Sequence, residues 1–406
     1  MSPVVGVAVF LVLGAALFVC WRQAVSRGRQ LVAASISAES GDPELAVLIA
    51  AQSVAATWPF GHPVLPEAEQ QLHHAIEAGM ELPAWNGHGP YRVSSVAWSP
   101  AGMLLLATAG QGNTANVWDA GTGKELLALR GHSDLISSVV WSPDGRRLTT
   151  GSADNTAKVW DARTGKELLT LRHSANVASV VWRPDGKRLA TGSIDGVAKV
   201  WDAETGKELL TLSMGNIVET MAWSPDGKRL ATGGEGAAAK VWDAATGKEL
   251  LTLGDQVALS VVWRPDGKRL ATGTIDGPAK VWDAGTGKEL PSLSGHSGSV
   301  FSMAWSPDGK RLAAGGEDTT IRVWNTGTGK ELLTLSGHST SVESVAWSPD
   351  GRRLASASDI VRIYVMDIRD LMALARERVT AHPSTEGCKK YLHVDKCPAA
   401  PALVWW

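Results

Sequence analysis

Apolar and polar positions alternate through the middle of the chain, and the alternation repeats about every 40 residues. Short stretches such as 139–141 and 188–191 place every second side chain on one face, as half-buried β-strands do. Between such stretches lie Pro-Asp-Gly turns and Asp-Ala-x-Thr-Gly-Lys turns, both of which favour tight hairpins. The pattern therefore predicts four short antiparallel strands in each copy.

Two aromatic residues mark each copy, and the chain has 18 Trp beside only 4 Phe and 3 Tyr. A four-stranded unit of about 40 residues is typical of a propeller blade, and seven such units can close a ring. The sequence therefore predicts an all-β fold, a seven-bladed β-propeller. The first aromatic residues of the seven copies are Trp98, Trp141, Trp182, Trp223, Trp263, Trp305 and Trp347. The second are Trp118, Trp160, Trp201, Trp242, Trp282, Trp324 and, in the seventh copy, Tyr364.

These copies resemble the WD40 repeat family over about residues 81–367. The matching motifs are Gly-His pairs at 131–132, 295–296 and 337–338, the Trp-Asp pairs that close the copies, and an Asp between them. The resemblance implies a buried hydrogen-bond chain in each blade, which joins the histidine, a Ser or Thr, the Asp and the second Trp. The complete set occurs twice, as His132, Thr150, Asp154 and Trp160 and as His173, Thr191, Asp195 and Trp201.

The other copies depart from this set. Met214 and Gly236 replace the His and the Asp in the fourth copy, and Gly254 replaces the His in the fifth. Ala314 replaces the hydroxyl in the sixth copy, and the seventh is one residue shorter before Tyr364. These blades must rely more on the packing of Trp and Val side chains, so we expect the first, fourth and seventh blades to open earliest.

The two ends of the repeat region complement each other. Residues 81–86 align with the outer strand 331–336 but have no blade before them, and the last copy has no outer strand after Asp367. We expect residues 81–86 to complete the seventh blade, because a closed ring leaves no free sheet edge.

An uncharged segment lies near the start of the chain, at residues 4–21 after the short N-terminus 1–3. At about 1.5 Å per residue it would reach about 27 Å as a helix, enough for a transmembrane helix. A cleaved signal peptide would need a basic residue before this segment, and a bulky Val before Cys20 argues against lipoprotein processing. Three arginines follow between 22 and 29, so we expect a single-pass cell-membrane protein with a cytoplasmic propeller.

Residues 22–80 favour a helical linker. Asp42 and Pro43 form a helix start, residues 43–57 are apolar almost all round, and a third helix is expected from Pro66 to Gly79. The order of these segments resembles the linker before the WD40 part of bacterial STAND-type signalling NTPases. The resemblance leaves an alternative function open, in which the chain is the sensor or regulatory half of such an NTPase, separate from its nucleotide-binding domain.

The tail, residues 368–406, is expected to begin with a short helix at 371–379. It also contains His382, Cys388, His393 and Cys397, whose spacing differs from that of common zinc sites, so no metal is expected. Cys388 and Cys397 are either reduced thiols or, less usual in the cytoplasm, a disulfide bridge.

Composition and repetition exclude several function classes. The chain is 44% hydrophobic, which excludes a disordered protein, and 39 Lys+Arg against 41 Asp+Glu gives no basic field for nucleic acid. The Gly-Thr-Gly-Lys segments at 121–124 and 285–288 lack the flanking residues of a phosphate-binding loop, and Thr-Gly-Lys recurs in the other copies. Repeated His, Asp and Ser/Thr sets also fit structural networks better than catalytic triads. No catalytic residue, cofactor or small-molecule substrate is therefore expected.

Pairs of cationic residues recur after the Pro-Asp-Gly turns, from 146–147 to 352–353. The Asp and Glu of the neighbouring turns balance their charge, so we expect a solvated face, with contact to anionic lipid as the alternative.

Residues that depart from the repeat consensus gather in the connections at the opposite end of the blades. The other copies fold without them, so they are free to serve recognition. We expect a protein or peptide partner at this end and interpret the chain as a membrane-tethered, non-catalytic protein–protein interaction scaffold. The candidate residues are Tyr91, Asp134, Leu135, Ile194, Asn216, Ile217, Asp255, Gln256, Ile275 and Glu317.

Overall fold

The structure, a computed structural model, describes residues 22–38, 43–57, 66–78, 92–100 and 104–378. The chain divides into two compact units: Met1–Leu82 with Asp367–Trp406, and Pro83–Met366. The described helices belong to the first unit and the described strands to the second.

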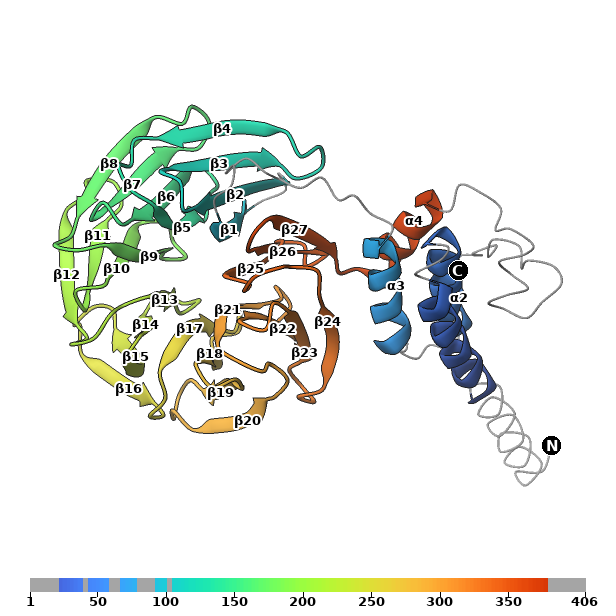
Figure 1. Ribbon diagram of the computed structural model, residues 1–406. Helices are drawn as coiled ribbons and strands as arrows, with labels where there is room; N and C mark the ends of the chain where they lie inside the picture. Colours follow the sequence, from blue (N-terminus) through green and yellow to red (C-terminus); the bar gives the residue numbers. More distant parts are fainter. Residues whose placement is uncertain (1–21, 39–42, 58–65, 79–91, 101–103, 379–406) are drawn as a thin grey trace, which may run out of the picture. The chain divides into compact units, whose positions relative to one another are not determined.

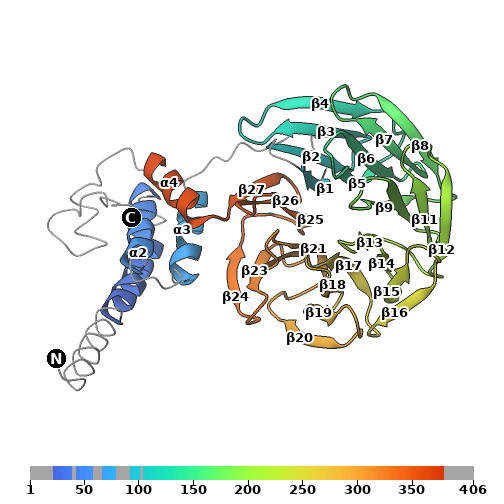
Figure 2. The same cartoon turned by 180° about the vertical axis from the view of Figure 1, so that it is seen from behind.

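The second unit is a ring of seven antiparallel sheets in the described part of the chain (Figures 1 and 2). Each sheet keeps the order of its strands in the sequence, with the first strand innermost. The first three blades are β1 (Val93–Trp98), β2 (Leu105–Gly110), β3 (Thr114–Asp119) and β4 (Glu125–Arg130); β5 (Ile136–Trp141), β6 (Arg147–Ser152), β7 (Thr156–Asp161) and β8 (Glu167–Arg172); and β9 (Val177–Trp182), β10 (Arg188–Ser193), β11 (Val197–Asp202) and β12 (Glu208–Ser213).

The next three blades and the described part of the seventh follow the same plan, which confirms the predicted all-β propeller. They are β13 (Thr220–Trp223), β14 (Arg229–Gly234), β15 (Ala237–Asp243) and β16 (Glu249–Leu253); β17 (Ala258–Trp263), β18 (Arg269–Thr274), β19 (Ala279–Asp283) and β20 (Glu289–Leu293); β21 (Val300–Trp305), β22 (Arg311–Gly316), β23 (Ile321–Asn325) and β24 (Glu331–Leu335); and β25 (Ser344–Trp347), β26 (Arg353–Ala357) and β27 (Val361–Val365).

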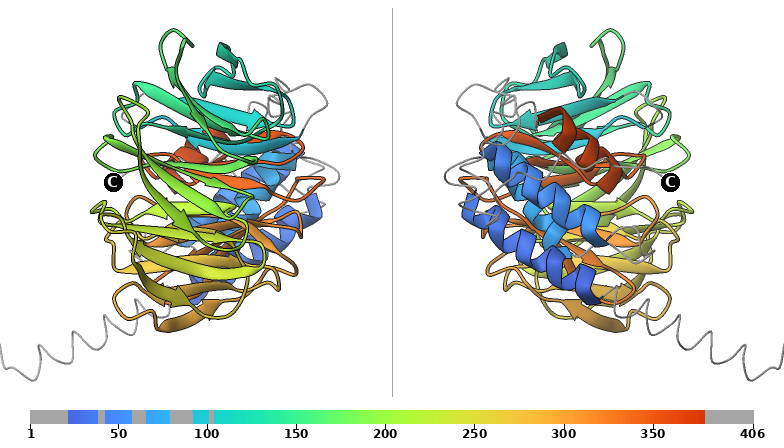
Figure 3. Two further views of the ribbon diagram at one scale, coloured as in Figure 1. Left: turned by 90° about the vertical axis from the view of Figure 1, so that its left-hand side faces the viewer. Right: turned by 90° about the vertical axis from the view of Figure 1, so that its right-hand side faces the viewer.

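The turn residues explain why each copy folds back on itself. In the second blade the hydroxyl of Ser142 donates to Asp144 at 2.6 Å and accepts from the amide of Arg147 at 2.9 Å, while Gly145 has a positive φ of 68°. The hairpin between the third and fourth strands is held by its Asp. In the first blade the Asp119 carboxylate accepts from the Thr122 hydroxyl at 2.8 Å and from the Thr122 amide at 2.7 Å. The Thr-Gly-Lys segment is therefore a hairpin turn. Seen from the edge of the ring, such turns gather at its two ends (Figure 3).

The ring closes where the first blade packs on the seventh. The amide of Val93 donates to the carbonyl of Ser358 at 2.9 Å, and the indole of Trp98 donates to the carbonyl of Ala346 at 3.0 Å. Three strands of the seventh blade are described, and the segment expected to complete it, residues 81–86, lies outside the described residues.

Polar contacts also join neighbouring blades all round the ring. Between the fourth and fifth blades, the amide of Val261 donates to the hydroxyl of Thr220, and the indole of Trp263 donates to the carbonyl of Ala222, both at 3.1 Å. Apolar clusters likewise combine strands from two consecutive blades. Each blade is therefore stabilised by its neighbour as well as by its own core.

The cationic pairs take part in these contacts. Lys228 is exposed, as predicted for a solvated face, but Arg229 is half-buried, so the prediction is wrong for the second member of the pair. The guanidinium of Arg229 lies 4.4 Å from the ring centre of Trp263 in the next blade and donates to the carbonyl of Ala284 at 2.5 Å. The physical reason is strand alternation, because two consecutive residues project to opposite sides.

The same arginine contact recurs in other blades. Arg147 lies 4.9 Å from the ring of Trp182 in the third blade and donates to the carbonyl of Ala203 at 2.7 Å. Arg311 lies 4.5 Å from the ring of Trp347 in the seventh blade. A repeated arginine therefore links each of these blades to the next.

The first unit is helical in its described residues, at 22–38, α2 (Pro43–Thr57), α3 (Pro66–Ala78) and α4 (Ile368–Arg378). The hydroxyl of Ser35 donates to the carbonyl of Ala46 at 2.9 Å and accepts from the amide of Gln71 at 3.3 Å. Residues 46–51 of α2 are buried, and α4 lies against both α2 and α3. Helices from both ends of the chain therefore share one core.

Two further predictions of the sequence also fall outside the described residues. These are the membrane segment 4–21 and the four His and Cys residues between 382 and 397. Within the part of the chain that the structure describes, no helix is both long and apolar enough to span a bilayer, and no group of three His, Cys, Asp or Glu side chains is arranged to hold a metal ion.

Candidate functional site

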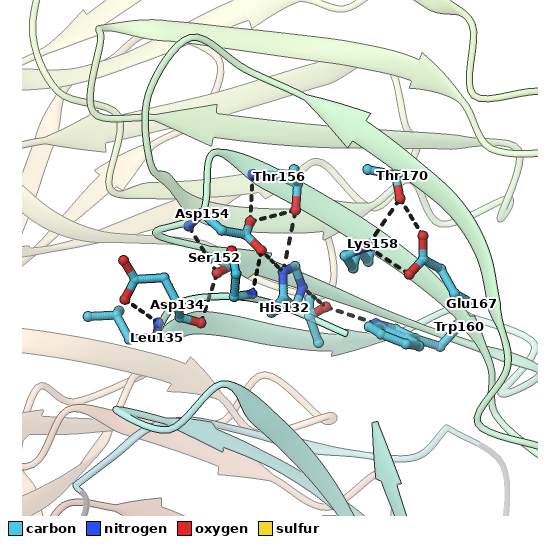
Figure 4. Close-up of polar contacts among 12 residues, drawn as sticks. His132, Asp134, Leu135, Ser152, Asp154, Thr156, Lys158, Trp160, Glu167 and Thr170 are labelled. Atoms are coloured by element: carbon cyan, nitrogen blue, oxygen red, sulfur yellow. Dashed lines mark hydrogen bonds and ion pairs between the residues drawn. The ribbon is translucent and has the colours of Figure 1, made fainter. Parts of the chain in front are cut away.

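A hydrogen-bond chain runs through the second blade (Figure 4). His132 Nδ1 lies 2.8 Å from Asp154 Oδ2, and His132 Nε2 lies 2.7 Å from Thr150 Oγ1. The indole of Trp160 donates to the same Thr150 oxygen at 2.8 Å. Burial lowers the pKa of His132, so the imidazole is neutral, with its Nδ1 proton donated to Asp154 and its Nε2 accepting from Thr150.

In the third blade the predicted chain is incomplete. His173 Nε2 lies 2.6 Å from Thr191 Oγ1, and Trp201 donates to that oxygen at 2.7 Å, but Asp195 makes no hydrogen bond to His173. The Asp195 carboxylate instead accepts from the hydroxyl of Ser174. His173 Nδ1 is buried without a partner among the described residues, and burial lowers the pKa of this histidine to about 4.

These two blades differ in the residues around the carboxylate. In the second blade, the hydroxyl of Thr156 donates to Asp154 at 2.6 Å and holds the carboxylate towards the histidine. The third blade has Val197 at that position, which offers no hydroxyl. The Asp195 carboxylate accepts from Ser174. The seventh blade also has a valine at this position, Val361, but keeps the contact between His338 and Asp359.

The seventh blade has a polar set that sequence reasoning missed. His338 Nε2 lies 2.7 Å from Ser356 Oγ, and His338 Nδ1 lies 3.1 Å from Asp359 Oδ1. The signal was present in the sequence, because Ser356 occupies the hydroxyl position, but the shorter copy hid the alignment. In the fourth blade Met214 fills the place of the histidine and is buried against the hydroxyl of Thr232.

These networks fix the connections at one end of the ring. This end carries the connection from the last strand of one blade to the first strand of the next, and the turn between the second and third strands. We call it the loop face; its central residues are 92, 111, 134–135, 153, 176, 194, 216–217, 219, 235, 255–257, 275–276, 299, 317 and 343.

Backbone hydrogen bonds hold the two kinds of connection together on the loop face. The amide of Ala153 donates to the carbonyl of Leu135 at 2.9 Å, and the hydroxyl of Ser152 donates to the carbonyl of Asp134 at 3.1 Å (Figure 4). The equivalent amide bonds in other blades join Gln111 to Arg92, Ile194 to Asn176 and Glu317 to Ser299. The side chains on this face are therefore presented by ordered loops.

The structure places most of the predicted recognition residues on this face with exposed side chains. Leu135 is 37% exposed, and Ile194 and Ile275 are each 40% exposed, whereas the exposed leucines of the outer strands, such as Leu126 at 45%, lie away from this face. Ile217 is half-buried, and Tyr91 lies outside the described residues. The other exposed members are Asp134, Asn216, Asp255, Gln256 and Glu317.

Sequence reasoning predicted the loop-face carboxylates Asp134, Asp255 and Glu317 but missed three glutamates, at 219, 235 and 343. Glu219 is half-buried, and its pKa is raised by burial and by the nearby Glu235. Glu343 forms a 3.9 Å ion pair with Arg92. The signal of Glu219 and Glu343 was a departure from the serine at the equivalent position of the second copy, Ser137, and the proximity of Glu219 to Glu235 shows only in the fold.

Comparison with known proteins supports the repeat assignment. The family of the IFT122 first beta-propeller matches residues 92–256, and that of the anaphase-promoting complex subunit 4 WD40 domain matches 251–305. The WD domain, G-beta repeat, matches 287–325 and 329–359.

Curated relatives share parts of the chain. Ribosome assembly protein 4 from Chaetomium thermophilum is 35% identical over 83 residues, which are 20% of this chain and 15% of that protein. Coronin-7 from Mus musculus is 41% identical over 59 residues, 14% of this chain and 6% of that protein. The guanine nucleotide-binding protein subunit beta from Schizosaccharomyces pombe is 34% identical over 77 residues, 19% of this chain and 25% of that protein.

The chain thus spans at most a quarter of the length of these relatives. The matches to repeat families run through the same residues that form the ring of seven sheets. The chain therefore carries WD40 repeats folded as a seven-bladed β-propeller.

Proposed function

We propose that the chain is a non-catalytic interaction scaffold whose loop face binds a protein or peptide. The observation that supports this most directly is the exposure of Leu135, Ile194 and Ile275 on hydrogen-bonded loops at one end of the ring. Apolar side chains that gather on one face of ordered loops are a common feature of protein–protein interaction surfaces. The repeat does not need them, since other copies have Arg92, Asn176 and Ser299 at the position of Leu135, and Ala153, Glu235 and Glu317 at that of Ile194 and Ile275.

The buried polar sets support a structural rather than a catalytic role. The hydroxyl of Thr150 is fully buried and is shared between His132 and Trp160, so no substrate could reach it as a nucleophile. The relatives include, by name, an assembly protein and a subunit of a guanine nucleotide-binding protein, which supports a role within protein complexes.

A substitution on the loop face tests the proposed function. We expect Leu135→Asp combined with Asp134→Arg to abolish capture of the partner in crosslinking and mass spectrometry, without changing the melting temperature. Leu126→Asp is the matched control, because Leu126 is 45% exposed but lies on the outer strand β4. Capture that survives the double substitution would show that the binding face is wrongly assigned.

We also propose that residues 4–21 anchor the protein in the cell membrane, with the propeller in the cytoplasm. The uncharged segment and the arginines that follow it support this arrangement. The chain should stay in the membrane pellet during alkaline carbonate extraction, whereas Leu11→Arg with Leu13→Arg should release it. If the unchanged chain were released by carbonate as completely as the double variant, residues 4–21 would not be a membrane anchor.

A second candidate function is the sensor part of a STAND-type NTPase. The helices at 22–38, α2 and α3 favour it, because they have the order expected of the linker before such a WD40 part. Blotting native cells with an antibody to the propeller separates the two functions. A band near 42.9 kDa supports the scaffold, and a much larger band, resistant to detergent and reductant, supports the sensor.

A further inference from the structure

The apolar side chains of the loop face lie along consecutive blades. Leu135 belongs to the second blade, Ile194 to the third, and Ile275 to the fifth, with the half-buried Ile217 in the fourth. Neighbouring blades touch here, because the amide of Val218 donates to the carbonyl of Ser193 at 3.1 Å. The exposed apolar side chains therefore lie in blades two, three and five, and Ile217 between them is half-buried; we call these four residues the apolar arc.

Two carboxylates accompany this arc in the fourth blade, Glu219 and Glu235. The backbone amide of Glu235 donates to the carboxylate of Glu219, so the two acidic side chains lie close together in the fourth blade. Neither forms an ion pair with a Lys or Arg among the described residues. None of the described lysines belongs to the loop face; they lie in the turns of the other end or in the third strands. Arg92 does belong to it, at the first blade, and pairs there with Glu343 rather than with the fourth-blade carboxylates.

This arrangement leaves negative charge in the fourth blade that a cation would neutralise. A half-buried carboxylate beside a like charge is unfavourable, as the raised pKa of Glu219 reflects. A cationic side chain bound between Glu219 and Glu235 would lower that pKa and stabilise both negative charges. An anionic surface, including anionic lipid, would instead be repelled.

We propose that the loop face binds a peptide segment rich in both basic and apolar residues, with its apolar side chains on Leu135, Ile194 and Ile275 and its cations at Glu219 and Glu235. This inference rests on the proposed function and adds the chemistry of the partner. The apolar arc supplies contact area, and the carboxylates select the charge of the segment.

Selection from a random library tests the chemistry of the partner directly. The full chain is immobilised, and a library of random twelve-residue peptides displayed on phage is enriched on it, with the Leu135→Asp Ile194→Asp protein as the counter-selection. We expect the enriched peptides to carry more Lys, Arg and large apolar residues than the starting library.

The outcomes separate the charge inference from the proposed function. Enrichment of acidic or neutral peptides that still require Leu135 and Ile194 would overturn the basic partner but keep the binding face. If no peptide binds the unchanged chain better than the Leu135→Asp Ile194→Asp protein, both the basic partner and the proposed binding face are wrong.

Single substitutions then test the carboxylates with one enriched peptide as the probe. We expect Glu235→Gln to weaken its binding roughly tenfold in fluorescence anisotropy, and added salt to weaken binding to the unchanged chain. The matched control is Glu204→Gln, an exposed glutamate in a turn at the opposite end of the ring. Equal effects of the two substitutions would overturn the assignment of the charge to this site.

Discussion

Replacing Arg229 by alanine should loosen the contact between the fourth and fifth blades. The guanidinium lies 4.4 Å from the ring centre of Trp263 and donates to two carbonyls of the fifth blade, those of Ala284 and Gly267. Both of these blades lack the histidine of the internal hydrogen-bond chain. The arginine contact should therefore matter more here than in the second blade.

The expected loss follows from the contacts. A partly buried cation–π pair contributes about 1 to 2 kcal/mol. The hydrogen bonds add about 1 kcal/mol, because water can reach the freed carbonyls and limits the penalty. The combined loss of about 2 to 3 kcal/mol corresponds to a fall of about 4 °C in the melting temperature of a domain of this size.

Thermal unfolding followed by tryptophan fluorescence measures this loss. Lys228→Ala is the matched control, since it removes a neighbouring exposed charge that makes no such contact. Arg229→Lys should lose more than half as much as Arg229→Ala, because an ammonium cannot reach two carbonyls and stack on the ring together. Equal falls for Arg229→Ala and Lys228→Ala would refute the reasoning, since net charge alone would then explain the effect.

Three further substitutions test other parts of the fold. Thr150→Val leaves the indole of Trp160 without its acceptor and should cost about 2 kcal/mol in urea unfolding; a loss below about 0.5 kcal/mol would contradict the network. Burial holds the pKa of His173 at about 4, below its unfolded value of 6.5, so its contribution to stability is present above pH 6.5 and lost as the pH falls towards 4. His173→Gln should reduce the dependence of the free energy of unfolding on pH between 6.5 and 4, and an unchanged slope would contradict the assignment to His173. A Cβ on Gly192 would lie 2.6 Å from a side-chain carbon of the next blade, so Gly192→Ala should destabilise by about 2 kcal/mol, whereas Gly121→Ala, with 3.4 Å to its nearest neighbour, should have little effect on the melting temperature.

The blades could be predicted from the sequence because their period and turns are local signals. Trp141 and Trp160 face the same strand residue, Leu148, in the observed register, and the second to sixth copies all keep this spacing. That the Arg229 side chain points to the opposite side from Lys228 could also have been derived from strand alternation. Its partner Trp263 lies in another copy, however, and charge counting alone suggested a solvated pair.

The candidate site was predictable in position and less so in detail. Leu135, Ile194 and Ile275 stood out because they depart from the consensus, and all three are exposed on the loop face. The hydrogen bond expected between His173 and Asp195 is absent because the carboxylate accepts from the hydroxyl of Ser174 instead of from the imidazole. That choice depends on side-chain rotation, which a repeat alignment does not contain.

The shared helical core has a consequence for how the ring behaves when it opens. The chain enters the first blade after α3 and leaves the seventh before α4, and α4 lies against α2 and α3. If the contact between β1 and the seventh sheet breaks, the packed helices still join the two ends of the ring by a second connection, in addition to the chain that runs through the blades. Re-pairing is then an intramolecular event with a high effective concentration, so a transient opening should reseal faster than a partner strand could invade it.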